Sequence, residues 1–112
     1  MWVVSAVGFF SIVHKPEDPG ELTIRARVRE DLEALKEFYL PTMSDIIESD
    51  DSDYRYRGFD SKEAVSEALG EIAKDIDYRN FKDEIRLKYG DERAVIYSEV
   101  WGRLFRLRIL DH

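Results

Sequence analysis

The chain has 112 residues and no cysteine, and its 17 basic and 24 acidic side chains give a formal net charge of −7. This length suits one domain that buries a core without metals or disulfides. The lack of cysteine excludes a disulfide scaffold, a thiolate metal site and a cysteine nucleophile. The negative charge opposes non-specific attraction to nucleic acid and to anionic membranes, so such a contact would need a segregated basic face.

The first 15 residues are rich in apolar and β-branched side chains. Residues 1–6 and 9–15 predict two strands of a hairpin, with residues 7–8 as the turn; a single bent strand is the alternative. The doublets Val3-Val4 and Phe9-Phe10 place large apolar groups on both faces, which is typical of strands in the middle of a sheet. No basic region or cleavage site accompanies this stretch, and no stretch is long enough to span a bilayer. We therefore expect a soluble protein in a reducing cytoplasm.

A turn rich in proline and glycine at residues 15–21 separates the hairpin from a third strand. In residues 22–28 apolar side chains alternate with Thr23, Arg25 and Arg27, which is the period of a half-buried strand with its arginines outward. The period then changes to that of a helix, with Leu32, Leu35, Phe38 and Tyr39 on one stripe. Pro41 is expected to end this helix.

An acidic loop at residues 45–53 precedes a short strand, predicted from about Tyr54 to Gly58. Asp60 followed by Glu63 is typical of a capping box at a helix start. Further on, Asp77 or Asn80 is expected to cap a helix that Gly90 closes, and Asp91 to cap the last helix. Gly70 and Gly102 fall inside predicted helices, where close approach of another backbone would explain them. Together these segments predict a single globular α+β domain over residues 1–112, with a small, largely antiparallel sheet in the order β-β-β-α-β-α-α and helices packed on it.

The sequence contains few motifs for catalysis. Its only histidines, His14 and His112, offer little for a nucleophile and base pair, and no phosphate-binding glycine loop is present. We expect no cofactor and lean against an enzyme, and no particular carboxylate pair for acid–base catalysis stands out among the 24 acids. Asp50, Asp51 and Asp53 are weak candidates for a metal site. Carboxylates suit a hard metal ion, but Arg55 occupies the position where the calcium-loop pattern requires a third ligand.

The strongest candidate surface comes from the abrupt change between the acidic loop and DYRYR at residues 53–57. If Tyr54 and Tyr56 point into the domain, Arg55 and Arg57 point outward, beside Arg25 and Arg27 of the other alternating strand. Both strands flank the same helix, so a crossover can place them in one sheet with four arginines on one face. Such a face suits a phosphate-bearing or carboxylate-bearing partner, and pairing with nearby acids is the structural alternative.

Several segments together resemble a family of small, uncharacterised, single-domain bacterial proteins, over residues 1 to about 107. The resemblance rests on MWVV with GFFS at residues 8–11, RARVREDLEAL at 25–35, DYRYR, DIDY with NFKD at 75–83, and Tyr97 with Val100-Trp101. It implies a compact cytoplasmic domain and transfers no activity, cofactor or site residue.

Three functions remain open from the sequence. The first is a non-catalytic protein-interaction module: an adaptor, an inhibitor or a self-associating domain. A homodimer is possible, because the first two strands carry apolar side chains on both faces and a second copy could cover one of them. The second is a nucleic-acid or phosphate-ligand binder that uses the same arginines. The glycine and aromatic residues of GFFS weakly resemble a strand of an RNA-recognition motif. The third is a small metal-dependent enzyme built on the acidic loop. No membrane partner is expected.

Overall fold

The computed structural model describes residues 1–111, so His112 lies outside the described residues. Backbone contacts divide the chain into two compact units, Met1–Ile76 and a second that begins at Asp77. The fold class is α+β, as predicted, while the expectation of a single domain stays a prediction. No helix among the described residues has the length and apolar character needed to cross a membrane.

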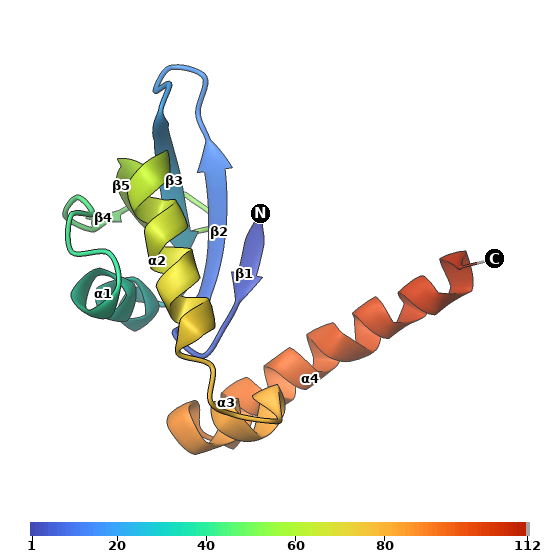
Figure 1. Ribbon diagram of the computed structural model, residues 1–112. Coiled ribbons are helices and arrows are strands. Elements are labelled where there is room, and N and C mark those ends of the chain that lie inside the picture. The colour runs from blue at the N-terminus through green and yellow to red at the C-terminus, as the bar shows by residue number, and fades with distance from the viewer. Residues whose placement is uncertain (112) are drawn as a thin grey trace. The chain divides into compact units, whose positions relative to one another are not determined.

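The first unit contains a five-stranded sheet in which every neighbouring pair is antiparallel (Figure 1). Its strands are β1 (Trp2–Val4), β2 (Phe9–His14), β3 (Glu21–Ala26), β4 (Ile47–Glu48) and β5 (Tyr56–Ser61), in the spatial order β1-β2-β3-β5-β4. The predicted hairpin is confirmed, since β1 pairs with β2 and the backbones of Ser5 and Gly8 bond to each other across the turn.

Helices α1 (Arg29–Phe38) and α2 (Lys62–Lys74) cover one face of this sheet. Figure 1 shows α2 running across the front of β3 and β2. The core between helices and sheet includes the fully buried Phe10 and Ile24 from the strands and Leu32 from α1. Side chains that alternate with these core residues lie on the opposite sheet face.

The second unit is a helical hairpin. It consists of α3 (Phe81–Tyr89), α4 (Asp91–Phe105) and the short 3₁₀ helix η1 (Arg106–Leu110). Asn80 caps α3, because its side-chain oxygen accepts a hydrogen bond from the backbone N–H of Asp83 at 2.9 Å. Gly90 ends α3 with a φ of 95°, a conformation that glycine adopts without strain.

The observed order β-β-β-α-β-β-α-α-α adds the strand β4 to the predicted elements; the three helices after β5 were each expected, although the predicted order counted only two of them. β4 was missed because two residues are too few to show a period of two. The prediction that both hairpin strands lie inside the sheet is wrong for β1, because β1 forms an edge and pairs only with β2 among the described residues. Its apolar side chains are correspondingly open, with Trp2 70% exposed.

Three local predictions also need correction. The cap of α2 is Ser61 and not Asp60, because β5 continues through Ser61 and the Ser61 hydroxyl accepts the Ala64 N–H at 3.1 Å. Asp91 makes no side-chain cap of α4. No other segment of the described chain comes within 4 Å of the place that a Cβ on Gly70 or Gly102 would occupy, so close backbone approach does not explain either residue.

Candidate functional site

A row of cross-strand neighbours places two arginines side by side on the sheet face opposite α1 and α2. Ser11 of β2 lies opposite Arg25 of β3, and Arg25 lies opposite Arg57 of β5. Directly opposed side chains in an antiparallel pair share a face, with Cβ atoms about 4.5–5.5 Å apart. Alternation along β3 and β5 therefore brings these two cations together, as the sequence predicts.

Neither Arg25 nor Arg57 has an acidic partner among residues 1–111. Arg25 Nη2 donates to the Ser11 hydroxyl at 2.7 Å, and Arg57 Nη2 donates to the Ser52 hydroxyl at 2.9 Å. A guanidinium carries five N–H donors, so most of the donors of these two arginines have no acceptor among residues 1–111. The Nε atoms of Arg25 and Arg57 are buried and have no acceptor in the described part of the chain. An external anion would therefore bind to the Nη groups of the two arginines.

Tyr54 lies between the guanidinium groups of Arg25 and Arg27. The Cζ atoms of both arginines are 4.6 Å from the centroid of its ring, a distance at which cation–π attraction is significant. The ring of Phe9 is 6.3 Å from that of Tyr54, and Trp2 meets Phe9 edge to face at 6.2 Å. We call Arg25, Arg27 and Arg57 with these three rings the arginine face.

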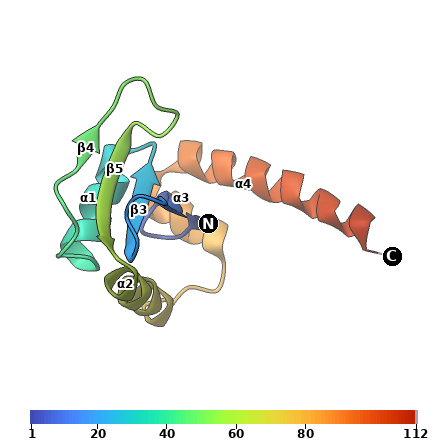
Figure 2. The ribbon, with the colours of Figure 1, turned by 90° about the horizontal axis from the view of Figure 1, so that it is seen from above.

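The loop between β4 and β5, which Figure 2 shows beside the sheet edge, neutralises two of the four predicted arginines. Arg27 Nη2 bonds both carboxylate oxygens of Asp53, at 3.0 and 3.1 Å. Arg55 pairs with Glu48 at 3.1 Å and with Asp50 at 2.9 Å. Asp50 in particular, with Tyr56 and Glu48, raises the pKa of the exposed Arg55 above its ordinary value. These exposed pairs contribute little stability, because water screens them.

The structure separates the two tyrosines that were expected to point into the domain together. Tyr56 lies opposite Ala26 in the ladder and packs against the helix-covered core. Tyr54 precedes β5 and is buried on the arginine face instead, only 7% exposed. Arg55 contacts Glu48, Asp50 and the ring of Tyr56, so the arginine face contains three of the four predicted arginines.

The acidic loop does not gather into a metal site. Asp50 and Asp53 bind different arginines, and Asp51 is exposed. Within the part of the chain that the structure describes, no three histidine or acidic side chains lie close enough to hold one ion. His14, the histidine considered for nucleophilic catalysis, is exposed at the end of β2.

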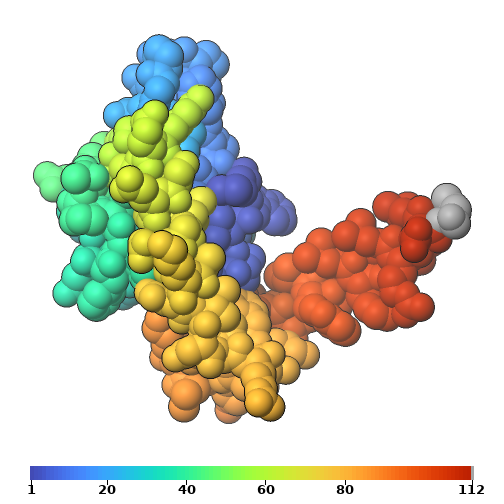
Figure 3. Space-filling model, in the orientation of Figure 1, coloured from blue at the N-terminus to red at the C-terminus, as the bar shows by residue number. Residues whose placement is uncertain are grey.

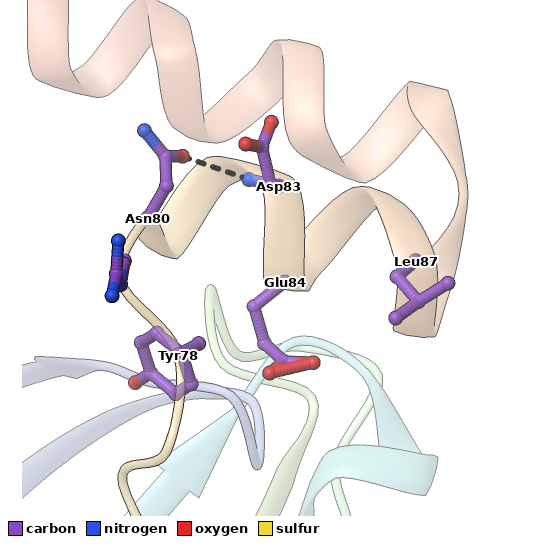
Figure 4. Close-up of a pocket in the computed structure, with 6 residues that line it drawn as sticks. Tyr78, Asn80, Asp83, Glu84 and Leu87 are labelled. Atoms are coloured by element: carbon purple, nitrogen blue, oxygen red, sulfur yellow. Dashed lines mark hydrogen bonds between the residues drawn. The ribbon is translucent and has the colours of Figure 1, made fainter.

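Two open hollows lie away from the arginine face. One, of about 290 Å³, is lined by Tyr78, Arg79, Asn80, Asp83, Glu84 and Leu87 (Figure 4). Burial, together with Glu84 and Asp77, raises the pKa of Tyr78. The other, of about 410 Å³, runs beside α1 and is lined by Glu33, Lys36, Glu37, Pro41 and Ile46. Neither brings together a nucleophile with a base or a set of unpaired cations.

Comparison with protein-family models, with curated proteins and with solved structures finds no match for this chain. No activity, ligand or site residue therefore comes from a relative, and the functional argument depends on the geometry of the arginine face.

The sequence did not indicate Ser52, Phe9 or Trp2 as parts of this site. Alternation along β2 places Phe9 and Ser11 on one face, so Phe9 could have been found once β2 was placed beside β3. Ser52 lies in an irregular loop, and no sequence period relates it to Arg57.

Proposed function

We propose that this protein is a non-catalytic interaction module that docks a carboxylate-bearing segment of a partner protein on Arg25 and Arg57. The observation that carries the proposal is the direct opposition of these two arginines in the β3–β5 ladder without an acidic partner. Like charges placed opposite each other destabilise a sheet, and an external oxyanion between them removes that cost. Planar guanidinium groups suit carboxylates, which they bind in a bidentate manner.

The surroundings favour a compact anion over a long polyanion. Glu48 of β4 and Asp50 and Asp53 of the loop that follows it lie beside the arginine face and already bind Arg27 and Arg55. A nucleic-acid backbone that passes through the site would meet these carboxylates, and the whole chain carries −7. A short acidic segment of a protein places one or two carboxylates on the central pair and avoids this repulsion. Action in the cytoplasm is part of the same proposal, on the basis of the cysteine-free composition.

A second function, binding of single-stranded nucleic acid, is favoured by one specific observation. Phe9 and Tyr54 share a face with the arginines, and Trp2, which meets Phe9 edge to face, is 70% exposed. Aromatic rings beside arginines are the platforms on which unpaired bases stack. Binding of this kind weakens steeply with salt, which separates it from the first proposal.

The test is to purify the tagged full-length chain at low salt and to identify what co-elutes, by mass spectrometry and by absorbance at 260 nm. The variant is Arg25→Gln with Arg57→Gln. The matched control is Arg29→Gln with Arg86→Gln, which removes the same number of charges from arginines that bind acids elsewhere, Glu33 in one case and Asp83 with Asp91 in the other.

We expect a stoichiometric protein that the control variant retains and the Arg25/Arg57 variant loses. Co-eluting nucleic acid that added salt releases would replace the first proposal with the second. Equal retention by both variants would refute any role for the central pair. Thermal unfolding of each variant verifies that a lost partner does not reflect a lost fold.

A further inference from the structure

The second unit contains a helix that is much longer than the helix that covers it. α3 has 9 residues, whereas α4 has 15 and continues for 5 more in η1. The ring of Phe81 on α3 stacks on that of Tyr97 at 5.9 Å, and Ile85 and Ala94 are both fully buried. The first turns of α4 are therefore packed against α3. In Figure 3 the red atoms of the C-terminal residues extend away from the orange atoms of the same unit.

Every described residue from Glu99 to Asp111 is exposed, and many of them are large and apolar. The exposed fractions reach 58% for Trp101, 56% for Leu104 and 69% for Leu110. Single apolar residues on a surface are ordinary, but a contiguous apolar patch marks an interaction site. The exposed set is Val100, Trp101, Leu104, Phe105, Leu107, Ile109 and Leu110.

Only some of these side chains continue the stripe of α4 that faces α3, and the others form a separate stripe. With 3.6 residues per turn, Ile96, Val100 and Leu104 form a second stripe beside that of Ala94, Tyr97 and Trp101. Ile96 is 53% exposed and Val100 is 38% exposed, so the second stripe is open from the middle of α4 onward. We call Ile96, Val100, Leu104 and Leu107 the outer stripe. It adjoins the α3–α4 interface along one edge.

Charge on the same helix runs from acidic to basic. Asp91 and Glu92 occupy the first turn of α4, and Arg103, Arg106 and Arg108 lie toward the C-terminal end. Residues 100–110 carry +3; since the whole chain is −7, the remainder carries −10. A second copy of the helix, laid antiparallel, places its acidic first turn beside the basic end of the first copy and opposes the two helix dipoles favourably.

We propose that two copies of this chain associate through their outer stripes, with the α4 helices antiparallel and centred on Val100. Val100 lies at the midpoint of the helical segment that α4 and η1 form. In this register Ile96 of one copy faces Leu104 of the other, and Glu92 faces Arg108. The contact continues the apolar surface that α3 already covers, and the complementary charges select the antiparallel arrangement.

Disulfide trapping tests the register, because the chain has no cysteine of its own. Val100→Cys is expected to form a covalent dimer under mild oxidation. Ile96→Cys alone is expected not to do so, whereas a mixture of Ile96→Cys and Leu104→Cys copies gives the cross-linked heterodimer. A parallel pair would instead link Ile96→Cys to itself, and that result would overturn the proposed arrangement. The control is Val95→Cys, which is also exposed but lies about 140° around the helix from Val100.

The molar mass in solution, from light scattering or sedimentation, tests association itself. We expect a dimer that Val100→Asp with Leu104→Asp weakens by more than about tenfold, because carboxylates at the centre of an apolar contact lose their hydration. Val95→Asp, the matched control, keeps the dimer. Arg108→Glu is expected to weaken association and Glu92→Arg in the same chain to restore it. These side chains are exposed, so circular dichroism should show unchanged helix content.

A wild-type chain that stays monomeric at high concentration would overturn the proposal, as would equal loss of association in the Val95→Asp control. The dimer does not depend on the arginine face. The Arg25→Gln and Arg57→Gln variant is therefore expected to dimerise like the wild type, and failure of one proposal leaves the other intact.

Discussion

Replacing Gly8 by alanine should damage the turn that joins β1 to β2. Gly8 has a φ of 153°, which L-residues rarely adopt, and a Cβ at this position would lie 2.4 Å from Cγ of Asp31. Asp31 is only 2% exposed, and its Oδ2 accepts the backbone N–H of Phe9 at 3.0 Å. The carboxyl group therefore has little room to move, and the added methyl group competes with the hydrogen bond that fixes the start of β2 against α1.

The expected loss of unfolding free energy is the sum of two effects. Backbone strain at such a residue costs about 1–3 kcal/mol. Loss of a buried hydrogen bond to a charged group costs about 1.5–3 kcal/mol. We expect Gly8→Ala to lower the free energy of unfolding by about 2.5–6 kcal/mol, a large fraction of the stability of an ordinary domain.

Urea unfolding followed by circular dichroism at 222 nm measures this change. The control is Gly70→Ala: Gly70 lies inside α2 with no atom near its Cβ position, and alanine there should add up to about 1 kcal/mol. A Gly8→Ala protein within about 1 kcal/mol of the wild type would refute the reasoning, because neither strain nor the displacement of Asp31 could then be real.

Three further predictions follow from single contacts. The hydrogen bond from Tyr39 to Asp75, 2.6 Å long, raises the pKa of Tyr39 to about 12. Because this pKa in the folded protein exceeds the ordinary 10.0, the bond should stabilise the fold fully below pH 10, and this stabilisation should disappear as the pH rises toward 12. Tyr39→Phe should lower stability by about 0.5–1.5 kcal/mol near neutral pH and remove one tyrosinate step near pH 12 from the titration at 295 nm; an unchanged titration would contradict the bond. Ser61→Ala should cost about 1 kcal/mol in urea unfolding, since the cap of α2 is lost; no change would return the cap to Asp60. Arg25→Gln with Arg57→Gln should alter stability by less than about 1 kcal/mol, because relief of repulsion offsets the lost cation–π contact; global unfolding would show that the pair is structural.

The elements with a long, regular period could be predicted from the sequence. β3 was found from its alternation, and the helices from their apolar stripes and from the cap Asn80. β4 has two residues, Ile47 and Glu48, which carry no period at all. The start of α2 was placed one residue early because Asp60 and Ser61 are both good cap acceptors, and only the length of β5 decides between them.

For the candidate site too, residues within regular strands could be predicted from the sequence, and residues in irregular segments could not. Alternation was enough to place Arg25 and Arg57 on a common face, because both lie within strands. It failed for Tyr54 and Arg55, which precede β5 in an irregular segment where side chains do not alternate between faces. Whether an acid neutralises a given arginine depends on the path of residues 49–55, and no local pattern determines that path.

The central claim is that Arg25 and Arg57 form an open site that binds a carboxylate group of a partner protein. The most direct measurement is a ¹H–¹⁵N NMR titration of the arginine Nε–H resonances with acetate and, separately, with inorganic phosphate. The Nε groups of both arginines are buried, so their protons should exchange slowly enough to be observed. We predict saturable shifts for Arg25 and Arg57 and little change for Arg27 and Arg55, whose guanidinium groups already bind acids. Uniform shifts across all the arginines, or none at Arg25 and Arg57, would contradict the account.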